Sequence, residues 1–176
     1  MLTSMKVLIK FFLFVILIVG FQLLGVTEEK KLEVANNELN FYSGMFDFSD
    51  DGKRSVLFGI QHQNEELFRE SFLGTLSPVT GGMVTADNAV YLYSGVQAEY
   101  EMGSFTFTPS FTPGIYEEGN GKDLGYPVEF KSEVQLSLNL SENSLFGMSY
   151  NHISNASLGD KNPGANSYMF NFLKRF

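Results

Sequence analysis

The residues that could carry out chemistry lie near the end of the chain, where His152 and Ser154 are two positions apart. Alternate residues of a β-strand share a face, so an imidazole and a hydroxyl at this spacing project side by side. Such a pair can act as a nucleophile with its general base. By itself the pair is weak evidence, since a histidine that is hydrogen-bonded near a strand end is the simpler alternative.

The composition excludes several other kinds of chemistry. The chain has no Cys, which rules out a thiolate nucleophile, a disulfide framework and a cysteine metal site. Its two histidines, His62 and His152, leave little room for a zinc site, and we expect no metal or cofactor. The net charge of -8 argues against nucleic acid as a partner. It does not argue against insertion into a membrane, because barrels keep charge in their interior and loops.

Strands are predicted to position the pair, because the chain after Glu38 alternates apolar and polar residues with a period of two. The clearest case is 128–140, where one face is apolar and the other is charged or polar. A strand of this length can cross a bilayer when it is tilted. The other predicted strands are 40–48, 55–63, 72–84, 89–102, 104–116, 144–154 and 166–176.

Eight strands with short turns at one end and longer loops at the other are typical of the smallest outer-membrane barrels. The sequence therefore predicts an all-β fold, an eight-stranded antiparallel transmembrane β-barrel. A soluble, lipocalin-like barrel would show the same alternation with its apolar face inward. The terminal Phe176, on an aromatic-alternating strand, favours the membrane barrel, because outer-membrane barrels end in this way.

The start of the chain resembles an export signal. Lys6 and Lys10 precede an apolar run over 11–25, and charged residues follow abruptly. We expect residues 1–27 to be a signal peptide, although no clear cleavage motif fixes its end, and 28–176 to form a single barrel domain. A retained inner-membrane anchor is the alternative.

The predicted strand directions place the His–Ser pair at the outer rim. If the terminal Phe lies at the periplasmic end, the loop over 155–165 is extracellular. Even positions carry the bulky apolar side chains in both final strands, so His152, Ser154 and Asn166 should face lipid on adjacent strands. Polar groups on a lipid face are costly unless they are used. A substrate that reaches them would be a lipid of the outer leaflet.

The pattern His-x-Ser-Asn-Ala-x-Leu at 152–158, followed by Asn162, Gly164 and Ser167-Tyr168, resembles the active-site segment of the lipid A 3-O-deacylases, the outer-membrane PagL family. The resemblance implies a protein of the outer membrane of a Gram-negative bacterium. It implies hydrolysis of the ester at the 3-position of lipid A, the membrane anchor of lipopolysaccharide, with release of a 3-hydroxy fatty acid. No cofactor is implied, and the sequence leaves open whether the protein is a homodimer.

The same resemblance assigns Ser154 as the nucleophile, His152 as the base and Asn162 as an oxyanion donor, with Asn155 assisting either the oxyanion or the loop.

The sequence departs from the family pattern at Asn166, where the pattern has Glu. An amide can orient an imidazole but brings no negative charge. Two hypotheses follow. One is a working Asn-variant deacylase, which we favour because the other site residues remain. The other is a catalytically impaired or non-enzymatic small barrel, structural or lipid-binding.

Overall fold

The computed structural model describes residues 37–50, 52–64, 69–71 and 74–176, and the predicted signal peptide lies outside these ranges. Nine strands are found there, of which β3 is a three-residue strand that pairs antiparallel with the first residues of β4. The other eight form a closed antiparallel barrel. The strands are β1 (Glu38–Phe46), β2 (Ser55–Gln63), β3 (Arg69–Ser71), β4 (Gly74–Thr85), β5 (Val90–Met102), β6 (Phe105–Glu117), β7 (Val128–Ser141), β8 (Ser144–Ser154) and β9 (Ala165–Arg175).

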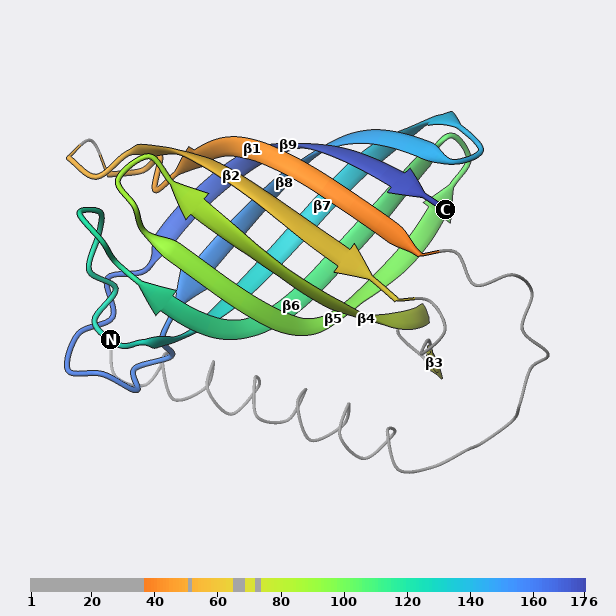
Figure 1. The fold of residues 1–176 in the computed structure, drawn as a ribbon. Coiled ribbons are helices and arrows are strands. Elements are labelled where there is room, and N and C mark those ends of the chain that lie inside the picture. The colour runs from red at the N-terminus through yellow and green to blue at the C-terminus, as the bar shows by residue number, and fades with distance from the viewer. Residues whose placement is uncertain (1–36, 51, 65–68, 72–73) are drawn as a thin grey trace. The chain divides into compact units, whose positions relative to one another are not determined.

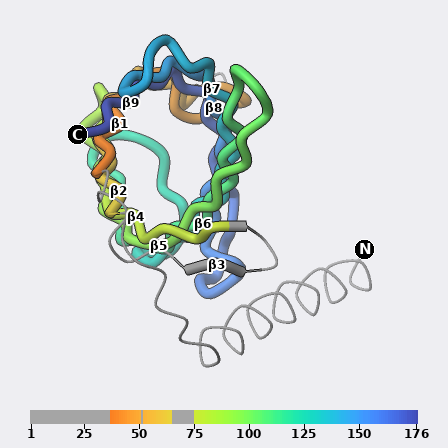
Figure 2. The backbone as a smooth tube through the Cα atoms, turned by 90° about the vertical axis from the view of Figure 1, so that its right-hand side faces the viewer, coloured from red at the N-terminus to blue at the C-terminus, as the bar shows by residue number. Residues whose placement is uncertain are grey.

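Each strand of the barrel pairs with its neighbour in the sequence, and two further pairings make the sheet continuous. β2 pairs with β4, and the first strand, β1, pairs with the last strand, β9. Figure 1 shows β1 and β9 side by side, and Figure 2 shows the strands following one another around a ring. The predicted fold class is therefore confirmed. The predicted strand over 72–84 begins at two residues outside the described ranges, and its remainder lies in β4.

The outward face of the barrel is apolar and the inward face is largely polar. β8 shows the rule, with alternating exposed and buried residues along its length. Its exposed positions include Phe146, Met148 and Tyr150, whereas Ser149 and Asn151 are buried. This arrangement is that of a membrane-spanning barrel, and it excludes the soluble alternative, which needs an apolar interior. In the described part of the chain, no helix is long and apolar enough to span a membrane.

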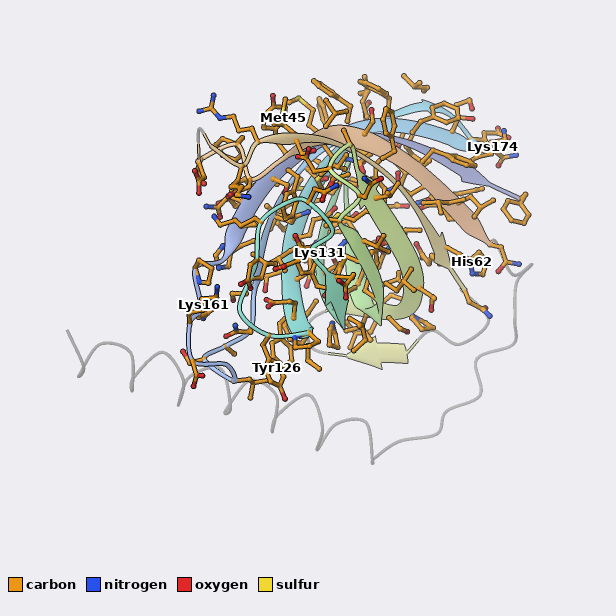
Figure 3. The ribbon with its side chains drawn as sticks, turned by 60° about the vertical axis from the view of Figure 1, so that its left-hand side comes forward. Met45, His62, Tyr126, Lys131, Lys161 and Lys174 are labelled. Atoms are coloured by element: carbon orange, nitrogen blue, oxygen red, sulfur yellow. The ribbon has the colours of Figure 1, made fainter. Side chains whose placement is uncertain are left out.

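Side chains fill the interior, as expected for a barrel of eight strands. Lys131 of β7 is 2% exposed, and its Nζ lies 2.9 Å from Glu133 Oε2 and 3.9 Å from the ring centroid of Tyr93. Figure 3 shows Lys131 inside the barrel. Nearer the end of the barrel where β1 begins and β9 finishes, Arg175 Nε donates to Glu38 Oε2 at 2.9 Å. The interior is thus held together by paired polar groups, and it keeps the strands in register.

The connections alternate between the two ends of the barrel. One end carries the connections 47–54, 86–89, 118–127 and 155–164. The other end carries the two-residue turns 103–104 and 142–143, together with the β2–β4 connection and the chain end at Phe176. Three connections of eight to ten residues therefore lie at the end where β8 finishes and β9 begins, and the β2–β4 connection of ten residues lies at the other end.

Candidate active site

Three outward-facing polar residues lie side by side on neighbouring strands. In the ladder register, His152 of β8 is opposite Ser132 of β7 on one side and Asn166 of β9 on the other. His152 is exposed and Asn166 is half-buried. The row lies on the lipid-facing surface, at the end of the barrel that carries the longer loops.

A hydrogen bond joins His152 to Asn166, with Nδ1 and Oδ1 2.8 Å apart. Because an amide oxygen can only accept, Nδ1 must carry the proton in this contact. The other ring nitrogen, Nε2, is then an unprotonated acceptor in the neutral ring, which is the form that a general base requires. Asn166 therefore contacts the ring nitrogen that carries the proton and leaves Nε2 as the acceptor.

Ser154 lies on the same outward face, two residues beyond His152 and opposite Phe130 of β7. Its side chain is half-buried. Among the described residues no hydrogen bond joins His152 to Ser154. Catalytic hydrogen bonds often close only when a substrate is bound, so this separation is compatible with the nucleophile–base pairing.

The segment after Ser154 is a tight turn. Leu158 N donates to Asn155 O at 3.0 Å, and the two central residues, Ala156 and Ser157, have φ of 53° and 66°. Positive φ at both central positions is typical of a type I′ turn. The turn reverses the chain directly after the candidate nucleophile.

The Asn155 side chain is fully buried, and the loop occupies its polar atoms. Its Nδ2 donates to Leu124 O at 2.9 Å and to Lys161 O at 2.8 Å, while its Oδ1 accepts from Ser157 N at 2.9 Å. This geometry favours the loop role over the oxyanion role, because both amide hydrogens are already bonded.

Asn162 is exposed and lies against the end of β8. Its Oδ1 accepts the backbone N–H of Asn155 at 3.1 Å. That contact orients the amide, so the NH₂ group is the end that remains for another partner. Asn162 is thus bonded to the residue that directly follows Ser154.

Gly164 brings the backbone close to the imidazole. It has φ of +64°, and a Cβ built at this position would lie 2.9 Å from Cε1 of His152. A side chain here would collide with the ring and strain the backbone. The requirement for glycine gives a physical reason for this part of the sequence pattern.

The loop over 155–164 is tied to the neighbouring loop over 118–127. Lys161 forms an ion pair with Asp123, and Figure 3 shows Lys161 at this end of the barrel. The hydrogen bond from Lys161 lowers the pKa of the Asp123 carboxyl, with help from the N–H of Gly125, and the same bond raises the pKa of Lys161. Asn155 adds a second link through Leu124 O.

The structure adds two residues that the sequence prediction did not include. Tyr150 Oη donates to Asn166 Oδ1 at 2.8 Å, and Asn166 Nδ2 donates to Ser49 Oγ at 3.1 Å. Tyr150 precedes His152 by two on the same face of β8, so the strand period could have suggested it, although aromatic residues there are typical of the lipid-facing band. Ser49 gives no local signal, because it is 117 residues from Asn166.

The fold and this polar row define a membrane-spanning barrel with a candidate hydrolase site on its lipid face. The sequence profile of the family described as lipid A 3-O-deacylase (PagL) matches residues 54–175, more than half of the chain. The chain therefore belongs to the lipid A 3-O-deacylase (PagL) family. No individual curated protein sequence matches the chain.

Solved structures resemble the barrel. The crystal structure of the outer membrane enzyme PagL gives a TM-score of 0.57 at 15% identity, and the match covers 78% of this chain and 98% of that one. A de novo designed transmembrane β-barrel gives a TM-score of 0.54 at 9% identity, over 84% of this chain and all of the design. At these identities the likenesses support the fold alone.

Proposed function

We propose that this barrel is an esterase that removes the 3-O-linked hydroxyacyl chain of lipid A in the outer leaflet of the outer membrane. The observation that carries the proposal is the 2.8 Å contact between His152 Nδ1 and Asn166 Oδ1, beside Ser154, on the lipid-facing surface. Membership of the deacylase family supports the reaction class. The outward placement of the site supports a substrate that approaches from the membrane.

In the proposed reaction Ser154 Oγ attacks the ester carbonyl carbon while His152 Nε2 accepts the hydroxyl proton. The tetrahedral intermediate collapses, the bond to the sugar oxygen breaks, and His152 returns the proton to that oxygen. Water then attacks the acyl-enzyme with His152 again as the base, the bond from the acyl carbon to Ser154 Oγ breaks, and His152 returns the proton to that oxygen. The products are a free sugar hydroxyl and a 3-hydroxy fatty acid.

The oxyanion of each tetrahedral intermediate is proposed to bind the amide NH₂ of Asn162. A positioned donor of this kind contributes about 3 kcal/mol to transition-state stabilisation in known cases. The acyl chain would lie along the aromatic surface beside Ser154, where Phe130 stacks on Phe111 with ring centroids 6.1 Å apart. Ser154 and this aromatic pair face outward, where a lipid chain can reach them without leaving the membrane.

The alternative is a barrel of this family that is impaired or inactive, and the observation that favours it is Asn166 itself. An amide oxygen holds the imidazole but does not stabilise an imidazolium by charge. In the proposed enzyme, orientation alone must suffice, as it does in Cys-His-Asn sites.

Mass spectrometry of lipid A from a Gram-negative host that expresses the chain separates these hypotheses. We expect loss of one 3-hydroxyacyl group with the parent chain and no loss with Ser154→Ala. Folding of each barrel is checked by heat-modifiable mobility on gels. An unchanged lipid A with a folded parent, together with loss in the Asn166→Glu variant, would identify the impaired barrel. An unchanged lipid A with both would refute the deacylase assignment.

A further inference from the structure

The amide of Asn166 is held at both ends. Its Oδ1 accepts from Tyr150 Oη at 2.8 Å and lies 2.8 Å from His152 Nδ1, while its Nδ2 donates to Ser49 Oγ at 3.1 Å. These contacts come from β8, β9 and the β1–β2 loop. An oxygen with two lone pairs is thus fully used, and the NH₂ group points in the opposite direction.

The orientation of this amide decides which nitrogen of His152 is the base. With the oxygen toward His152, Nδ1 carries the proton and Nε2 can accept one from Ser154. If the amide were rotated by half a turn, its NH₂ group would donate to Nδ1, and the proton of the neutral ring would move to Nε2. That tautomer cannot act as a base toward Ser154. A carboxylate has two equivalent oxygens and does not face this problem.

We propose that Tyr150 and Ser49 are positioning residues that hold the Asn166 amide with its oxygen toward His152 and so fix the catalytic tautomer. The inference rests on the proposed function for its kinetic consequence, but the tautomer itself can be measured without any substrate. Neither residue needs to touch the reacting atoms.

Tyr150 favours the observed orientation because its phenol is a better donor than acceptor, since the oxygen lone pair is delocalised into the ring. It therefore stabilises the amide oxygen, rather than the NH₂ group, beside it. Its ring is held by Phe48, whose centroid lies 6.2 Å away in an edge-to-face arrangement. The hydroxyl is thus presented from a packed position.

Ser49 is held in place by its own loop. Phe48 N donates to Asn166 O at 3.0 Å, which extends the β1–β9 ladder into the loop, and Arg54 Nε donates to Phe48 O at 2.8 Å. The next residue, Ser49, is therefore fixed against the Asn166 side chain. Since a hydroxyl accepts from the NH₂ group at this point, the two ends of the amide are distinguished by two independent partners.

The first test reads the tautomer by ¹⁵N NMR of histidine-labelled protein in detergent micelles, at about pH 9, where an ordinary imidazole is neutral. The chain has two histidines, so His62→Gln leaves His152 as the single signal. We expect the Nδ1–H form in the parent and a shift toward the Nε2–H form in the Tyr150→Phe/Ser49→Ala double variant. An unchanged tautomer in that variant would overturn the proposal.

Tyr168→Phe is the matched control. Tyr168 lies opposite Tyr150 on β9, also faces outward and also packs on Phe48, with ring centroids 5.4 Å apart. Its hydroxyl takes no part in the hydrogen bonds of Asn166. We expect Tyr168→Phe to keep the parent tautomer. A shift equal to that of the Tyr150→Phe/Ser49→Ala variant would show that the effect comes from aromatic packing, and it would refute the role of the phenol.

The second test is kinetic. With the parent amide, Tyr150→Phe is expected to lower turnover about fivefold, the factor that one ordinary hydrogen bond contributes. In an Asn166→Asp background the two oxygens are equivalent, so the same substitution should cost about twofold or less. Equal losses in both backgrounds would contradict an orienting role and would indicate a general structural one.

The two tests separate this inference from the proposed function. If no ester is hydrolysed but the tautomer shifts as expected, the positioning stands and the deacylase assignment fails. If lipid A is deacylated but the tautomer and the turnover of the Tyr150→Phe/Ser49→Ala variant equal those of the parent, the deacylase stands and the positioning fails.

Discussion

Replacing Asn166 by Asp tests how much a negative charge adds to the site. The two side chains have the same shape, so the contact of 2.8 Å with His152 Nδ1 can be kept. The two hydrogen-bonded neighbours of the amide can adapt, because Tyr150 already donates to Oδ1 and the Ser49 hydroxyl can turn from acceptor to donor. The variant therefore changes charge with little change in packing.

The expected gain follows from the strength of one contact. A neutral hydrogen bond contributes about 1 kcal/mol net, and a bond to a charged group about 1.5–3 kcal/mol. His152 is exposed, so a Coulomb term at about 4 Å with a water-like dielectric is also about 1 kcal/mol. Both estimates apply when the imidazolium forms in the transition state. The activation free energy should therefore fall by about 1 kcal/mol, which raises turnover about fivefold.

The assay is the initial rate of release of the 3-hydroxy fatty acid from lipid A in mixed micelles, at saturating substrate, for the parent and Asn166→Asp. Ser154→Ala in each background gives the rate that does not depend on the nucleophile. A folded Asn166→Asp barrel whose turnover equals or falls below that of the parent would refute the reasoning, because it would mean that His152 does not become charged against residue 166 during the reaction.

Three further predictions concern the loop around the site. Gly164→Ala should displace the His152 ring and lower turnover by about 10- to 100-fold, with heat-modifiable mobility unchanged, because its Cβ would lie 2.9 Å from Cε1. Asn155→Ala removes two buried amide donors, which should destabilise the loop by about 3 kcal/mol and expose it to proteases while the barrel stays folded. The ion pair lowers the pKa of Asp123 below its ordinary 3.8 and raises the pKa of Lys161 above its ordinary 10.5. The pair therefore contributes its full stabilisation of the two loops between pH 3.8 and 10.5. It is lost only as the pH falls through the lowered pKa of Asp123 or rises through the raised pKa of Lys161. The amide NMR signals of Asp123 and Gly125, which lie at this pair, should be constant inside that window and shift outside it.

Much of the fold could be predicted from the sequence because every strand of a membrane barrel has one face in lipid. Because the lipid-facing side chains must be apolar, the sequence alternates clearly between apolar and polar residues, as in 128–140, where the outward residues are mostly apolar. The structure places β7 at Val128–Ser141 and β8 at Ser144–Ser154, within one residue of the predicted bounds. The strand β3 was not predicted, since its three residues, paired with the start of β4, are too few to show an alternating pattern.

The site could be predicted where it depends on a single strand or on a pair of neighbours. His152 and Ser154 share a face by period alone, and Asn166 follows once β8 and β9 are paired around the loop. Ser49 could not be found in this way. Its contact depends on closure of β1 on β9 and on the conformation of the β1–β2 loop, where Asp47 has φ of 49°. The alternation of apolar and polar residues along a strand carries no information about barrel closure or about loop conformation.

The interior of the barrel determines the geometry of the outer site because both share the same strands. Odd positions of β8 point inward, where Asn151 Nδ2 contacts Met169 Sδ at 3.3 Å and Asn171 Nδ2 donates to Ser149 Oγ at 2.9 Å. Even positions carry the outward residues. A slip of one residue between β8 and β9 would break these inner contacts and also move His152 away from Asn166. The buried polar pairs therefore specify the register, and the register places the imidazole beside its amide.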